Sequence, residues 1–181
     1  MRLVAVESGI TPGAIYRHFR DKQALVDQVV ELAFDRFERS LLDAIVSLPV
    51  GSFARIAALG EAYIRFAEEH EEEFKVLFTP QGGHRRELDE LPGQGGYPIL
   101  RRCVVEAIEV GAMKPADPDH VALYLWSRVH GIVMLLLACD LGAESGSGRG
   151  LKPLEVFELT RSFVTDGLLL DGLPMVDGAD G

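Results

Sequence analysis

The chain has 181 residues, of which 48% are apolar and 25% charged, and its formal net charge at pH 7 is −10. This balance fits a soluble globular protein with a sizeable core, either one domain or one domain with a small appendage. No uninterrupted apolar run reaches the roughly 18 residues that a membrane span requires, and the N-terminus lacks a signal-peptide pattern, so we expect a cytoplasmic protein that does not enter a membrane.

The charge is distributed unevenly along the chain. The first 22 residues hold four Arg or Lys side chains against two acidic ones, so the rest of the chain carries all of the net negative charge. A small basic end on an acidic body is what a polyanion such as DNA would contact, although the excess alone favours nucleic acid only weakly. The two cysteines, Cys103 and Cys139, lie in apolar helical patterns, which favours free buried thiols over a disulfide.

Residues 1–19 read as two short helices joined by a tight turn. Gly9 suits the left-handed conformation that ends a first helix, Thr11 can cap a second one, and Pro12 suits its first turn. Ile15 and Phe19 are four residues apart, so we expect both side chains to point inward. This arrangement is typical of a helix–turn–helix, whose second helix lies in the major groove of DNA.

The second helix of this pair carries residue types that suit DNA contact. Its small residues allow close approach to base edges, its backbone N–H groups and hydroxyl favour phosphate, and Arg17 can reach a phosphate or a guanine. An ordinary helical hairpin with a solvated aromatic face explains the same residues about equally well. The candidate DNA-binding residues are Thr11, Pro12, Gly13, Ala14, Tyr16, Arg17, His18 and Lys22.

Residues 21–78 predict three more helices. Asp21 can cap the first, which ends before Pro49, Ser52 can cap the second, and a soft break at His70 precedes a short third helix. Apolar residues at steps of three and four give the first two helices one inward face each. These faces are Val26, Val30, Ala33, Phe37, Leu41 and Ala44 in the first, and Ile56, Leu59, Tyr63 and Phe66 in the second.

The second half of the chain alternates loops with helices. Gly and Pro residues mark a loop over 80–98, and a Gly- and Ser-rich linker follows over 142–150. We expect helices over 99–110, with Gly111 as the C-terminal cap, over 118–141 after the capping Asp117, and over 153–170. The inward residues expected in the last helix are Val156, Leu159, Phe163 and Leu168.

No strand of useful length is predicted, so the expected fold is all-α. It divides into a helix–turn–helix segment over 1–23, a helical bundle over 24–171 and a tail over 172–181.

Two stretches resemble a known family. "LVAVESGITPGAIYRHFRDKQALV" resembles the DNA-binding end of the TetR family of bacterial transcriptional regulators, through its Ala-x-x-x-Gly first helix, its small-residue recognition helix, its "YRHF" ending and the following Lys22. "LWSRVHGIVMLLL", residues 125–137, resembles the Trp-x-x-x-His-Gly segment of one class of TetR-like C-terminal domains. Together the resemblance covers nearly the whole chain.

The resemblance implies that 24–171 binds a small-molecule effector and dimerises through its last two long helices. We therefore expect a repressor that a small, largely apolar effector releases from a double-stranded DNA operator. A homodimer would match two half-sites one turn of DNA apart. The candidate ligand-binding residues, for each of which core packing is the alternative, are Tyr63, Phe66, Phe78, Tyr97, Trp126 and His130.

The N-terminus departs from the family pattern. TetR-like folds begin with a long amphipathic helix before the helix–turn–helix, whereas Met1 here aligns near the start of the second helix. We expect a misassigned start codon or a trimmed chain. The alternative is a true truncation, which would leave a sensor or dimerisation module that does not bind DNA.

The residues give no support for an enzyme. Catalysis would need a nucleophile–base pair or a metal cluster, and the five histidines are scattered without ligand spacing. The "HEEE" at 70–73 lacks the second histidine of a His-Glu-x-x-His site. We expect no enzymatic activity, no cofactor and no metal site.

Overall fold

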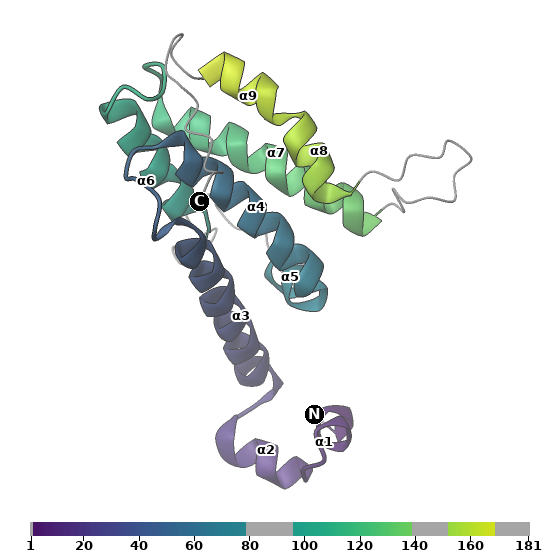
Figure 1. The fold of residues 1–181 in the computed structure, drawn as a ribbon. Coiled ribbons are helices and arrows are strands. Elements are labelled where there is room, and N and C mark those ends of the chain that lie inside the picture. Colours follow the sequence, from purple (N-terminus) through teal and green to yellow (C-terminus); the bar gives the residue numbers. More distant parts are fainter. Residues whose placement is uncertain (1, 79–95, 139–151, 169–181) are drawn as a thin grey trace, which may run out of the picture.

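A computed structural model describes the chain over residues 2–78, 96–138 and 152–168. Every regular element in these ranges is an α-helix, which confirms the expected all-α fold. The predicted linker, the tail and Cys139 lie outside the described residues, as does most of the predicted loop over 80–98. The helices in Figure 1 are α1 (Arg2–Glu7), α2 (Pro12–His18), α3 (Lys22–Ile45), α4 (Phe53–Glu69), α5 (Glu71–Phe78), α6 (Gly96–Glu109), α7 (Pro118–Ala138), α8 (Pro153–Leu159) and α9 (Arg161–Leu168).

Helices α1 and α2, called the head below, form a helix–turn–helix. Gly9 in the turn has a φ angle of 66°, which confirms the predicted left-handed residue. The Ala14 amide donates a hydrogen bond to Thr11 Oγ1 at 3.2 Å, which confirms the predicted cap of α2. The turn and the cap are thus set by local chemistry, before any contact with the rest of the chain.

Few of the described side chains of the head are buried. Ala5 and Ile15 are buried, but Phe19 lies beyond the end of α2 in extended backbone and is only half-buried. The inward position expected for Phe19 is therefore only partly right. Among the described helices, α1 and α2 contact only each other, and Figure 1 shows them at the end of α3 that lies away from the other helices.

Helix α3 connects the head to the bundle. The Ala24 amide donates to Asp21 Oδ1 at 2.8 Å, which confirms the predicted cap. The predicted inward face is partly right, because Val26, Val30 and Ala44 are only half-buried. Val26 and Val30 lie at the end of α3 that projects beyond the bundle (Figure 1). The fully buried residues of α3 are Ala33, Phe34, Phe37, Leu41 and Ile45, of which Phe34 and Ile45 were not on the predicted face.

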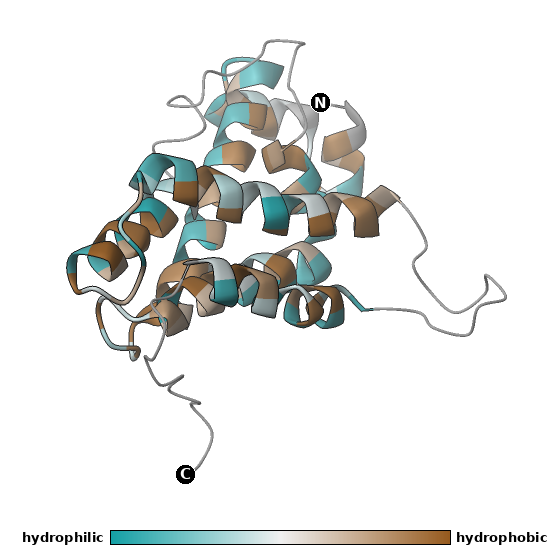
Figure 2. Ribbon diagram, turned by 90° about the horizontal axis from the view of Figure 1, so that it is seen from above, coloured by the Kyte–Doolittle hydropathy of each residue, from teal (hydrophilic) through white to brown (hydrophobic). Residues whose placement is uncertain are grey.

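The remaining helices and the C-terminal half of α3, called the body below, form one bundle around α4. Helix α4 contacts α3, α5, α6, α7 and α8. Its predicted face is confirmed, since Ile56, Leu59, Tyr63 and Phe66 are all buried. Figure 2 shows apolar and polar residues on each helix of the bundle, as expected of amphipathic helices that share a core.

The caps of α6 and α7 were predicted more accurately than the start of α6. Gly111 has a φ angle of 76°, and Asp117 Oδ1 accepts the Asp119 amide at 2.8 Å, so both predicted caps are confirmed. Helix α6 begins at Gly96, three residues before the predicted start. Pro98 did not end the loop, because a proline in the first turn of a helix leaves no hydrogen bond unmade.

The single helix predicted over 153–170 is wrong. The structure has two short helices, α8 and α9, which meet at Thr160. The predicted face is only partly right: Val156 packs against the core, but Leu159 and Phe163 are 62% and 74% exposed, and Phe157 and Val164 are buried instead. The side chain of Leu168 lies outside the described residues. Apolar residues occupy two faces of this segment, so the spacing alone did not indicate which of them meets α4 and α7.

Helix α7 is long and apolar enough, by length and composition alone, to cross a membrane. It has 21 residues, and an 18-residue stretch of it has a mean hydropathy of 1.7. In the structure α7 packs on α4, α6 and α8, and Val121, Ala122 and Val133 are buried there. The helix therefore behaves as a core helix of the bundle.

Candidate functional site

The head presents most of the candidate DNA-binding residues to solvent. Tyr16 is 55% exposed, and Arg17 and His18, in the last turn of α2, are exposed as well. Lys22 is exposed at the first position of α3. At the other end of α2, Thr11 and Gly13 are exposed, Pro12 is the first helical residue and Ala14 is half-buried. The eight residues thus lie on one continuous segment around α2.

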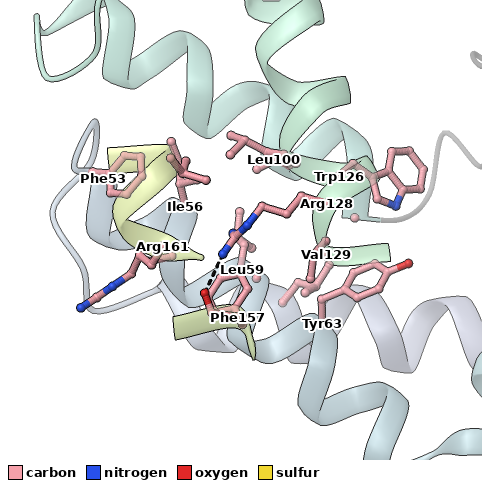
Figure 3. Close-up of a pocket in the computed structure, with 16 residues that line it drawn as sticks. Phe53, Ile56, Leu59, Tyr63, Leu100, Trp126, Arg128, Val129, Phe157 and Arg161 are labelled. Atoms are coloured by element: carbon pink, nitrogen blue, oxygen red, sulfur yellow. Dashed lines mark hydrogen bonds between the residues drawn. The ribbon is translucent and has the colours of Figure 1, made fainter. Parts of the chain in front are cut away.

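The body contains a cavity, partly open to solvent, that is lined mainly by α4 and α7, with further residues from α3, α6, α8 and α9. Its volume is about 50 Å³, which is room for only a few water molecules. Figure 3 shows most of the lining side chains to be aliphatic or aromatic. The lining residues are Leu41, Phe53, Ile56, Ala57, Leu59, Gly60, Tyr63, Gly96, Leu100, Leu125, Trp126, Arg128, Val129, Phe157, Arg161 and Val164.

Two of the six candidate ligand-binding residues, Tyr63 and Trp126, line this cavity. Tyr97 lies behind the wall, where its ring packs on Trp126 with centroids 5.0 Å apart. Phe66 and Phe78 pack edge-on against Phe37, at 5.0 and 5.9 Å. These aromatic side chains point inward from several helices and meet one another, so they fill the core instead of lining the cavity.

His130 also lies in the aromatic core, next to the cavity wall. Its Nδ1 is 2.8 Å from the Tyr63 hydroxyl. Burial lowers the pKa of His130 and raises the pKa of Tyr63, so both groups are neutral near pH 7. The pair is a neutral hydrogen bond that satisfies two buried polar groups and fixes the orientation of Tyr63.

Sequence reasoning missed Arg128, the most polar feature of the cavity. Its Nη2 donates to the Phe157 carbonyl at 2.6 Å and to Thr160 Oγ1 at 2.5 Å, and its Nε donates to the same hydroxyl at 3.1 Å. Burial lowers the pKa of this guanidinium. The signal in the sequence was that Arg128 is the one Lys or Arg within 118–138, the most apolar stretch of the chain.

Phe157 and Gly60 form the contact between α8 and α4 at the cavity. The guanidinium carbon of Arg128 lies 4.5 Å from the centre of the Phe157 ring, as a cation–π contact requires. A Cβ atom on Gly60 would lie 2.4 Å from Cζ of the same ring. Glycine at position 60 therefore allows the ring to lie against α4.

The described residues contain no group of three or more His, Cys, Asp or Glu side chains placed to hold a metal ion. The lining of the cavity is apolar apart from the Tyr63 hydroxyl, the Trp126 indole N–H and the two arginines, Arg128 and Arg161.

The comparisons with known proteins agree with a helix–turn–helix head followed by a helical body. Residues 1–29 match the family profile described as bacterial regulatory proteins, tetR family, and residues 56–151 match tetracyclin repressor-like, C-terminal domain. A search of curated proteins finds no significant match.

Two solved structures are similar over most of the chain. A protein of unknown function from Rhodococcus sp. RHA1 has 30% sequence identity and a TM-score of 0.72, over 93% of this chain and 84% of that one. A candidate regulatory protein, SCO4313, shares the fold, with 23% identity and a TM-score of 0.63 over 91% of this chain and 84% of its own. On the two profile matches, the chain belongs to the TetR family of DNA-binding bacterial transcriptional regulators.

Proposed function

We propose that the protein is a ligand-responsive repressor, in which the head binds a double-stranded DNA operator and the body binds a small, largely apolar effector. The observation that carries this proposal is the apolar cavity in the body, since most of its lining residues lie in the part of the chain that matches the C-terminal profile. Effector binding would favour a conformation that releases the operator. The protein would act in the cytoplasm and would have no enzymatic activity.

The functional protein would be a homodimer that associates through α7, α8 and α9. Large apolar side chains are exposed on these helices, which suits a surface that a second copy covers. They are Met134, Leu135, Leu159 and Phe163, which are 45%, 56%, 62% and 74% exposed. Two heads would then contact two half-sites on the same face of the DNA. The functional division would follow the expected bounds, with DNA binding in 1–23 and effector binding and dimerisation in 24–171.

DNA binding can be tested with fluorescently labelled duplexes from the region upstream of the gene. Fluorescence anisotropy would give the affinity at several salt concentrations. Replacing Lys22 with alanine should weaken binding to all sequences and reduce the salt slope by about one, because one phosphate contact is lost. Tyr16→Phe should weaken binding with less change in the slope.

The matched control for the DNA experiment is Lys75→Ala. Lys75 lies in α5 of the body, where it pairs with Glu71 and Glu72, so its loss should change neither the affinity nor the slope. An unchanged slope in Lys22→Ala would remove that residue from the phosphate contacts. If the unmodified chain binds no DNA at any salt concentration, the alternative of a sensor and dimerisation module is favoured.

A further inference from the structure

Among the described residues, the cavity holds a cation that forms no ion pair. Among its lining residues only Arg128 and Arg161 are charged. Arg161 forms an ion pair with Glu158 at 3.0 Å, and in Figure 3 its side chain extends away from the cavity. Arg128 lies in the midst of the lining side chains in the same view. It forms no ion pair within the described part of the chain, and the nearby Glu158 carboxylate, which is paired with Arg161, offsets only part of the effect of burial on the pKa of Arg128. An apolar cavity with one guanidinium that is hydrogen-bonded but forms no direct ion pair favours an anionic ligand.

The present partners of Arg128 are neutral and use only part of its guanidinium. They are the Phe157 carbonyl and the Thr160 hydroxyl, both at the C-terminal end of α8. Helix C-termini carry partial negative charge, which accounts for the position of the cation in the absence of a ligand. The bonds use Nε and Nη2, and Nη1 donates no hydrogen bond to any described residue. A carboxylate forms two parallel bonds with a guanidinium and is the stronger partner.

The other lining residues indicate the chemistry of the uncharged part of the ligand. Leu59, Leu125 and Val129 are aliphatic, and Phe53 and Phe157 present aromatic rings. A ligand that uses this lining needs an apolar body, and a ligand that pairs with Arg128 needs one negative charge. A volume of about 50 Å³ is small for such a molecule, so its entry requires a movable wall. The Phe157 ring, on the seven-residue α8, is the element that Arg128 holds in place.

We propose that the effector is a small carboxylic acid with an apolar body, whose carboxylate pairs with Arg128 and displaces the Phe157 carbonyl and Thr160 from it. This inference rests on the proposed function, since it identifies the chemical class of the effector in the same cavity. Binding would free the C-terminal end of α8 from α7. Because α8 and α9 belong to the proposed dimer surface, the loss of these hydrogen bonds would alter the contact with the partner subunit.

Matched probes test the class of the ligand. Octanoate and octan-1-ol share a tail, as do benzoate and benzyl alcohol, so each pair isolates the carboxylate. Titration calorimetry at pH 7.5 should show that at least one acid binds about tenfold or more tightly than its alcohol. Octylamine, with the opposite charge, should not bind. Equal binding within both pairs, or no binding by either acid, would overturn the proposal.

Two variants test whether the preference for the acid over its alcohol depends on Arg128. Arg128→Gln should lower the affinity for the preferred acid to that of its alcohol. Arg65→Gln removes an exposed arginine of α4 that does not line the cavity, and it should leave the preference unchanged. If the glutamine variant does not fold, Arg128→Lys keeps the charge but loses the paired bonds, and it should bind the acid about tenfold less tightly while still preferring it. A full preference in Arg128→Gln would contradict the proposal.

Hydrogen exchange separates ligand binding from a merely structural role of Arg128. The preferred acid should accelerate amide exchange in residues 157–160 of the unmodified protein and should have no such effect in the Arg128 variants. Slower exchange there on binding would contradict displacement. DNA anisotropy keeps the two hypotheses distinct: a chain that binds DNA but no carboxylate refutes this inference alone, and a chain that binds the acid through Arg128 but no DNA refutes the proposed repressor alone.

Discussion

The head and the body obtain their structure in different ways. In the head, Ala5 and Ile15 are the buried apolar residues, and the turn and the cap are fixed by Gly9 and Thr11. In the body, one cluster of buried side chains links α3 to α9. Most of the free energy of unfolding should therefore come from the body, whereas the positions of the exposed side chains in the head are set by the local turn and cap. This division suits a regulator whose recognition segment must move relative to its core.

The largest expected effect is the contrast between two core truncations. Phe74 is fully buried in α5, with its ring 5.5 Å from that of Tyr63 and 4.6 Å from that of Phe78. Phe74→Ala should lower the free energy of unfolding by about 3–5 kcal/mol. Ile15→Ala should change it by less than about 0.5 kcal/mol, because the head contacts no other described helix. Urea unfolding followed by circular dichroism would measure both.

A large loss of stability in Ile15→Ala would contradict this contrast between the head and the body. A loss above about 2 kcal/mol in Ile15→Ala would mean that the head and the body unfold as one unit.

The second prediction concerns the contact between Gly60 and Phe157. Gly60→Ala should lower the free energy of unfolding by about 1–2 kcal/mol, since overpacking against the ring outweighs the better helix propensity of alanine. Gly131→Ala in α7 is the matched control: a Cβ there meets nothing within 4 Å, so the variant should be stabilised by about 0.5–1 kcal/mol. Thermal unfolding of the two variants should shift in opposite directions.

The third prediction is a pH dependence located in the body. Because burial lowers the pKa of His130, the unfolded chain binds a proton at this residue more readily than the folded one. Stability should therefore fall as the pH drops below about 6.5, by up to about 1.4 kcal/mol per pH unit. His130→Asn should remove this part of the dependence, and His120→Asn, at an exposed position of the same helix, should retain it. Unfolding at pH 7.5, 6.5 and 5.5 would compare the three proteins.

The smallest expected effect concerns two N-terminal caps. Thr11→Ala removes the bond to the Ala14 amide and should destabilise α2 locally by about 1 kcal/mol, which would weaken DNA binding about fivefold. Ser52 is the matched residue in the body, where its hydroxyl is buried and makes no cap bond to the described residues. Ser52→Ala should be neutral or slightly stabilising. Equal effects of the two changes on DNA affinity would show that capping does not position the head.

Local features were predictable from the sequence. The caps at Thr11, Asp21 and Asp117 and the left-handed glycines at 9 and 111 follow from the chemistry of a few adjacent residues, and all are present. The exception is Ser52, which lies at the N-cap of α4 but makes no side-chain cap bond to the described residues. The inward face of α4 was also predictable, because its large apolar residues Ile56, Leu59, Tyr63 and Phe66 recur at steps of three and four.

Features that depend on contacts between distant segments were not predictable. The break at Thr160 and the burial of Phe157 depend on how α8 meets Arg128 and Gly60, which lie 32 and 100 positions earlier in the chain. The set of residues that line the cavity also depends on contacts between distant segments. The aromatic residues on inward faces were reasonable candidates for ligand binding. Most of them pack against one another, and only Tyr63 and Trp126 of the six line the cavity.

The length of α3 has a mechanical consequence. Lys22 lies eleven residues before Ala33, the first fully buried residue of the helix, so about 16 Å of it extends beyond the core at 1.5 Å per residue. A tilt of about 10° at Ala33 would then displace Lys22 by roughly 3 Å, whereas a hydrogen bond to a phosphate tolerates only a few tenths of an ångström. Such leverage means that a side-chain-sized rearrangement near the cavity suffices to misalign the protein on its operator, without any change in the fold.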